Sequence, residues 1–132
     1  RHAPDATACV APACPPTRLV LRHGTGATMM ELYEIVRCND HLLLDLSYTL
    51  LRYRGSSRLD DDMHFLFKTT DRLVTVGSDF PEYNHAQTIA RLAELTQGIE
   101  PHRIDNLTHR NLERWFGDGR ALATSASASP HA

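Results

Sequence analysis

The sequence predicts an α/β fold with parallel strands, and two observations carry this prediction. First, three apolar segments with the length of buried strands are each followed by a helical pattern of apolar residues; the strands span 18–22, 41–46 and 72–76, and the helices 27–38, 60–70 and 85–97. Second, the apolar runs are nearly continuous, which is typical of strands covered on both faces. Repeated strand–helix units favour parallel strands joined by right-handed crossovers.

The first unit places a short turn between its strand and its helix. The strand RLVLR ends at residues 23–26 (HGTG), which we expect to form the turn. Thr28 can cap the helix 27–38, and the apolar residues of this helix recur at helical spacing: Met29, Leu32, Ile35 and Val36. Asn39 and Asp40 then close the helix as a turn.

The second unit has a longer connection. Residues 47–58 follow the strand HLLLDL as a loop, with a helical turn expected at residues 48–53. The helix 60–70 begins with three aspartates, which suit the positive end of the helix dipole. Its apolar face is predicted to consist of Met63, Leu66 and Phe67.

Two helices complete the third unit. The helix 85–97 ends at Gly98, a residue suited to a helix C-terminus, and is expected to turn four residues inward: Ile89, Leu92, Ala93 and Leu95. A final helix over 101–116 is predicted to bury Ile104, Leu107, Leu112, Trp115 and Phe116.

Composition narrows the class of protein. The 132 residues are 42% apolar and 23% charged with a formal net charge of −2, which is ordinary for a globular domain and gives no footprint for nucleic acid or an anionic membrane. No apolar run approaches the roughly 18 residues of a transmembrane helix, and no signal peptide is recognisable. Cys9 and Cys14 have no second pair to complete a zinc site, which favours reduced thiols. The sequence therefore predicts a cytoplasmic protein that binds neither nucleic acid nor membrane.

The chain divides into three parts. Residues 1–17 are rich in Pro, Ala and Cys and are expected to be irregular. Residues 18–117 carry the strand–helix units. Residues 118–132 include the low-complexity stretch ALATSASASPHA, for which we predict disorder.

Polar residues gather where the predicted strands end. His23 follows the first strand, Asp45 and Ser47 the second, and Ser78 and Asp79 the third. Ligands of parallel α/β folds bind beyond these carboxyl ends, and a His with an Asp there can supply a metal ligand, a base or a proton shuttle. Each residue also has a structural interpretation, since His23 can bond its turn, Asp79 can cap backbone amides and Ser47 can bond local backbone. Asp45 can point inward or lie between strand and helix.

Four segments carry a resemblance to a known family. They are LVLRHGTG (19–26), HLLLDLSY (41–48), VTVGSDFPEY (74–83) and the ending NLTHRNLERWFG (106–117). In their order and spacing they resemble the C-terminal part of the metal-dependent amidohydrolase superfamily, in particular the amidohydrolase-related branch that includes aminocarboxymuconate-semialdehyde decarboxylase. The resemblance implies strands six to eight of a (β/α)8 TIM-type barrel, with the last helix closing it.

The resemblance also implies roles for individual residues. His23 would face a metal-bound water and polarise or deprotonate it. Asp79 would also be catalytic, because it would ligate a divalent metal, expected to be zinc, and exchange a proton with that water. Ser47, Ser78, Phe80 and Tyr83 flank the strand ends and are predicted to bind a small-molecule substrate. The implied reaction is cleavage of a C–N or C–O bond by activated water, or a non-oxidative decarboxylation.

The family pattern is incomplete in this chain. Its His-x-His pair of the first strand and its metal-binding His of the fifth strand have no counterpart, so the chain holds half of the expected site. A complete barrel needs roughly 250 residues, and the sequence begins at Arg1 without a Met. We therefore expect a fragment of a barrel, inactive by itself, whose unpaired sheet edges favour a homo-oligomer or another partner.

Three alternatives stay open. LVLRHGTGAT (19–28) also resembles the Arg-His-Gly segment of histidine phosphatases, in which His23 would be the nucleophile and Arg22 would hold phosphate. Gly24 and Gly26 open a helix after a strand as in nucleotide-binding modules, although Met29 occupies the third glycine position. The chain can also be a non-catalytic remnant.

Overall fold

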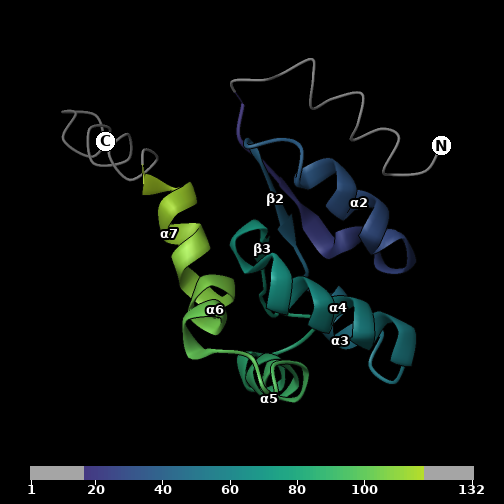
Figure 1. Cartoon of the computed structure of the whole chain (residues 1–132). Coiled ribbons are helices and arrows are strands. Elements are labelled where there is room, and N and C mark those ends of the chain that lie inside the picture. The colour runs from purple at the N-terminus through teal and green to yellow at the C-terminus, as the bar shows by residue number, and fades with distance from the viewer. Residues whose placement is uncertain (1–16, 118–132) are drawn as a thin grey trace.

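A three-stranded parallel sheet organises the structure, a computed structural model that describes residues 17–117. Its strands β1 (Leu19–Leu21), β2 (Leu42–Asp45) and β3 (Val74–Thr75) lie in the order β1-β2-β3 (Figure 1). This confirms the predicted parallel α/β fold. The predicted tail 118–132, nearly all of the segment 1–17, Cys9 and Cys14 lie outside the described residues.

Helices follow each strand, as predicted, but the first begins later than expected. The helix is α2 (Met29–Val36), and the predicted turn is a 3-10 helix, η1 (Arg22–Thr28). His23, Gly24 and Gly26 all have positive φ, which a right-handed α-helix does not accommodate, so the helix forms only beyond them. Gly24 is also required by space, because a Cβ there would lie 2.3 Å from Cδ2 of Leu46.

The second unit contains α3 (Thr49–Arg52), which confirms the helical turn expected at 48–53, and α4 (Ser57–Thr69). The strand predicted at 72–76 is shorter than expected. Residues Asp71–Leu73 form the 3-10 helix η2, closed by a hydrogen bond from the backbone N of Leu73 to the carbonyl of Thr70 (2.9 Å). β3 therefore starts only at Val74.

The last predicted helix is one helical run with a change of geometry in the middle. α6 (Pro101–Asp105) passes into a π-helical turn, η3 (Asn106–Arg110), and then into α7 (Asn111–Trp115). The wider turn, with its bond from the backbone N of Asn111 to the carbonyl of Asn106, places these two asparagines on one side. Both side chains then reach Asp71, Asn106 at Oδ2 (2.5 Å) and Asn111 at the carbonyl oxygen (2.5 Å).

The core lies between one face of the sheet and the helices α2 and α4, and it continues to Leu92 and Leu95 of the later helix 85–95 and to Leu107 of η3. Its members from the sheet are alternate residues, and the helices contribute the predicted apolar residues; the buried set includes Leu42, Leu44, Leu46, Val74, Met29, Leu32, Val36, Met63, Leu66 and Phe67. The run α6–α7 stands on the other side of the strands from α2 in Figure 1. Among the described residues no helix has the length and apolar character that a membrane span requires.

Three residues predicted to be buried are exposed. The buried stripe of α5 (His85–Leu95) consists of Thr88, Arg91, Leu92 and Leu95, so Ile89 and Ala93 fall on its outer side. Phe116 comes after the last turn of α7 and is also exposed.

The two faces of the sheet are covered unequally. The prediction that helices cover both faces is only partly met, because the face opposite the core borders an open cavity.

Candidate functional site

The candidate site lies at the carboxyl ends of the three strands. β1 leads into Arg22 and His23, β2 is followed by Ser47 and Tyr48, and Ser78 and Asp79 come after β3. Parallel strands end at the same edge of a sheet, so residues more than fifty positions apart in the chain meet there.

Asp79 is the centre of this cluster. Its Oδ1 lies 3.2 Å from Nε2 of His23 and accepts a hydrogen bond of 2.8 Å from Nη2 of Arg22. The Asp79 side chain is 18% exposed, whereas that of Arg22 is 67% exposed. A half-buried carboxylate thus holds an imidazole and a guanidinium together at the rim of the sheet.

The backbone at the same place is strained. Within residues 17–117 the non-glycine residues with positive φ are His23 (66°), Tyr48 (70°) and Asp79 (57°). Besides the contact with Asp79, His23 stacks on Tyr48, with ring centroids 5.2 Å apart, and its carbonyl accepts a hydrogen bond from Oγ1 of Thr49. Residues in this conformation persist only where their surroundings fix them, and they concentrate at functional sites.

A cavity of about 320 Å³ lies beside this cluster, on the sheet face opposite the core. Arg22 takes part in the cluster around Asp79 and also lines this cavity. The rest of the lining comes from the strands, their ends, α7 and the residue that follows it: Val20, Asp45, Ser47, Thr75, Val76, Gly77, Leu112 and Phe116. This volume suits a small molecule held by an apolar wall and a few polar groups.

The sequence left two orientations open for Asp45, inward or between strand and helix. In the structure its side chain faces the cavity. Register pairs it with Thr75, and both line the cavity. Its Oδ1 accepts hydrogen bonds from the backbone N (2.9 Å) and Oγ (2.6 Å) of Ser47. Gly77 fits tightly against this pair, because a Cβ there would lie 2.7 Å from Oγ of Ser47.

The predicted substrate-binding residues are distributed unevenly. Ser47 lines the cavity, but Ser78, Phe80 and Tyr83 do not. Oγ of Ser78 accepts a hydrogen bond from the backbone N of Phe80 (3.3 Å), and Phe80 itself is 78% exposed. Tyr83 lies near Tyr48, with ring centroids 6.0 Å apart.

Tyr48 also belongs to the candidate site, although the sequence did not predict it there. It was expected only as part of a helical turn, yet it joins His23 and Tyr83 through its ring contacts. The sequence holds no direct signal for this role, since it depends on the positive φ that turns the chain after Ser47.

The described residues do not form a metal centre. Residues 17–117 contain no group of three or more His, Cys, Asp or Glu side chains placed to hold one ion. The one predicted ligand, Asp79, directs Oδ1 to Arg22 and His23. A guanidinium at that oxygen is an unsuitable neighbour for a cation, so the zinc prediction finds no fit within this part of the chain.

Comparison with known proteins supports the fold alone. No family model and no curated protein matches the chain. A solved structure, an uncharacterized TIM-barrel protein of Bordetella bronchiseptica, superposes with a TM-score of 0.65 at 20% sequence identity. The match covers 86% of this chain and 39% of that one, so the chain has the structure of part of a TIM barrel.

Proposed function

We propose that this chain is the C-terminal part of a TIM-barrel hydrolase of the amidohydrolase type, in which His23 and Asp79 move a proton to and from the attacking water. The observation that supports the proposal is the 3.2 Å contact between Nε2 of His23 and Oδ1 of Asp79 at the carboxyl ends of the strands. Residues of TIM-barrel enzymes that take part in catalysis lie at this edge.

The chemistry follows from what each group can donate. An ionised carboxylate only accepts hydrogen bonds, so Nε2 of His23 carries the proton that faces Asp79. The other ring nitrogen, Nδ1, is then the basic one and can remove a proton from water. Stacking on Tyr48 and the hydrogen bond from Thr49 to the His23 carbonyl hold the ring and its backbone in place.

The substrate of the proposed reaction is a small molecule with a C–N or C–O bond, placed in the cavity of about 320 Å³. Ser47 offers its Oγ as a hydrogen-bond acceptor from the cavity wall, since its proton is donated to Asp45, and Arg22 offers a guanidinium at the rim. A decarboxylation in the same cavity is the alternative reaction, since a guanidinium can orient a carboxylate substrate.

The amidohydrolase type also uses a divalent ion. Because the described residues do not fit one, its ligands in this proposal come from outside residues 17–117, and we assign no step to the ion. The remaining strands of the barrel would supply them, in the same chain or in a partner.

The test is an assay of the complete barrel against a set of carboxylic esters, amides and phosphate monoesters. We expect hydrolysis of an ester or amide that falls by about 100-fold or more in His23→Gln and in Asp79→Asn. His109→Gln, on the exposed side of the last helical run, is the matched control and should keep full activity. Phosphate-monoester hydrolysis with phosphate trapped on His23 would instead establish the histidine phosphatase alternative.

A further inference from the structure

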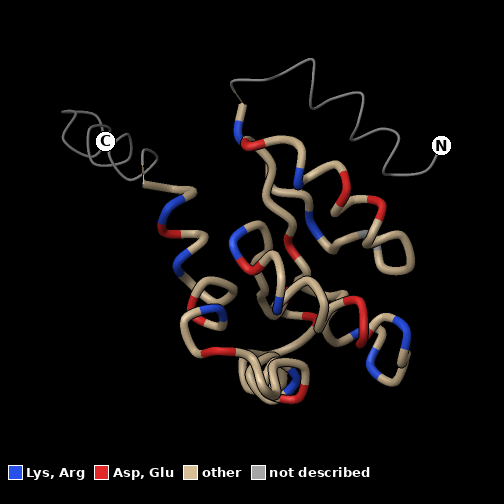
Figure 2. The backbone as a smooth tube through the Cα atoms, viewed as in Figure 1, with Lys and Arg blue, Asp and Glu red and all other residues tan. Residues whose placement is uncertain are grey.

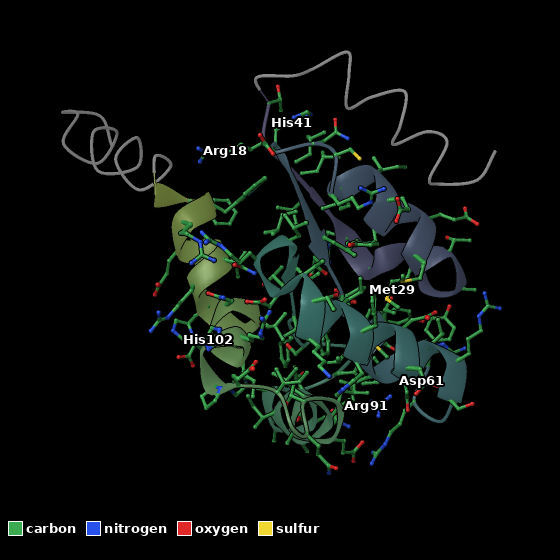
Figure 3. The ribbon with its side chains drawn as sticks, viewed as in Figure 1. Arg18, Met29, His41, Asp61, Arg91 and His102 are labelled. Carbon is green, nitrogen blue, oxygen red and sulfur yellow. The ribbon has the colours of Figure 1, made fainter. Side chains whose placement is uncertain are left out.

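A second cavity lies at the opposite end of β3 from Asp79 and is lined by basic side chains. It has a volume of about 400 Å³ and lies between the residues that precede β3 and the run from α6 to α7. Its lining consists of Asp71, Arg72, His102, Arg103, Asn106, Arg110 and Arg114. Figure 2 shows blue basic segments, all of them arginine, alternating with red acidic ones along this run, and Figure 3 labels His102 at its α6 end.

The single carboxylate of the cavity is already engaged. Oδ1 of Asp71 accepts a hydrogen bond from Arg103 (2.6 Å) and Oδ2 accepts one from Asn106 (2.5 Å). Asp71 is buried, so its charge serves to hold the helical run against the start of β3. It neutralises Arg103 alone among the four arginines of the lining.

The guanidinium groups of the other three arginines have no carboxylate within hydrogen-bond distance among the described residues. Arg114 bonds the neutral amide oxygens of Asn106 and Asn111. Arg110 forms a loose, exposed ion pair with Asp105, in which the distance of 3.7 Å between Nη2 and Oδ2 is too long for a hydrogen bond. Arg72 makes no ion pair within the described part of the chain, and its side chain is exposed.

We propose that this cavity binds a small molecule through a phosphate group. Guanidinium forks match the geometry of phosphate oxygens, and arginine stays charged at every physiological pH. The cavity of about 400 Å³ is larger than a phosphate ion and falls within the range of small-molecule sites, so the ligand is a phosphate monoester with a small organic part. This site is separate from the cluster of His23 and Asp79 and does not depend on the reaction proposed there.

The test measures binding of glycerol 3-phosphate to the 132-residue chain by the shifts of backbone amide resonances. We expect saturable shifts that concentrate in residues 71–72 and 102–114. Sodium chloride keeps the ionic strength constant during the titration. Succinate, a dicarboxylate of similar size, should bind more weakly.

Two variants decide whether the arginines of the cavity are responsible. Arg72→Gln and Arg110→Gln remove guanidinium groups without a short hydrogen bond, so the fold is kept. The double variant should raise the Kd by about tenfold or more, which is the effect of losing a hydrogen bond to a charged group. Arg58→Gln, at an exposed position of α4 outside the cavity lining, should leave the Kd unchanged.

Three results would overturn the proposal. They are no saturable shift up to about 10 mM glycerol 3-phosphate, an unchanged Kd in the double variant, and an equal loss of affinity in Arg58→Gln. The last result would mean that the phosphate responds to overall charge and not to this cavity.

Discussion

Nε2 of His23 lies 3.2 Å from Oδ1 of Asp79, although the two residues are 56 positions apart and both have positive φ. Neither local sequence nor an isolated turn brings them together. The parallel register of the strands does, because β1 and β3 end on the two sides of β2 at the same edge. The contact therefore depends on the integrity of the whole sheet.

The first prediction concerns this pair in the complete barrel. If His23 and Asp79 act as one unit, the double variant His23→Gln/Asp79→Asn should lose no more activity than the more damaging single variant. The measurement is kcat/KM for the three variants and the wild type. Losses that multiply in the double variant would mean that the two residues act independently.

The second prediction concerns metal binding. Since residues 17–117 provide no group of three metal-binding side chains, the 132-residue chain should bind zinc no more tightly than a chain with Asp79→Ala. Isothermal titration of both proteins with zinc chloride checks this. Submicromolar binding that is lost in Asp79→Ala would contradict the prediction and would make Asp79 a metal ligand in this chain.

The third prediction concerns the contact between Gly77 and Ser47. Gly77→Ala should destabilise the fold by about 1–3 kcal/mol, because the new Cβ would lie 2.7 Å from Oγ of Ser47, which Asp45 holds in place. Ser47→Ala removes that oxygen, so the double variant should recover part of the loss. Urea unfolding of the wild type, the two single variants and the double variant gives the coupling free energy. A value of zero would mean that the side chains at positions 77 and 47 are not in contact.

Much of the fold could be predicted from the sequence because the apolar pattern is strong. The continuous run around Leu43 has the length of a buried strand, and the helix that contains Met63 and Phe67 has a clear apolar stripe. The boundaries were less predictable, since they depend on particular backbone conformations. Positive φ at His23 delays α2, and the π-helical turn that aligns Asn106 with Asn111 has no signature in the spacing of apolar residues.

The candidate site could be predicted only in part, for a related reason. Polar residues after apolar strands are visible in a sequence, so His23 and Asp79 were expected at one edge. The contacts of Tyr48 depend on a tertiary arrangement and have no local pattern. The basic cavity was also not predictable, because three of its arginines lie on one helical run while the fourth, Arg72, comes from the segment before β3.

The fourth prediction concerns acid stability at Glu100. The backbone N–H of Glu100 and then the guanidinium of Arg103 lower the pKa of this carboxyl below its ordinary value of 4.5. A lowered pKa in the folded state stabilises the protein above about pH 4.5, and the contribution is lost as pH falls through the folded value. Glu100→Gln should therefore have a lower Tm than the wild type at pH 7 and an equal Tm once the wild-type carboxyl is protonated. A difference in Tm that is independent of pH would assign the effect to something other than charge.

The fifth prediction concerns Asn111, which joins the last helical run to the sheet. Its buried Nδ2 donates to the carbonyl oxygens of Asp71 (2.5 Å) and Val74 (2.6 Å). Asn111→Ala leaves two buried carbonyl groups without this donor and should lower the free energy of unfolding by about 2–4 kcal/mol.

Urea unfolding of Asn111→Ala provides the measurement, with Glu113→Ala, exposed on the same helix, as the control. Asn111→Asp keeps the size of the side chain but cannot donate from the replaced group when ionised, so it should be at least as destabilising as Asn111→Ala. If Asn111→Asp and Glu113→Ala were both near wild type, the two hydrogen bonds would not hold α7 on β3. Because Asn111 contacts neither His23 nor Asp79, its effect on the candidate site should follow global stability alone.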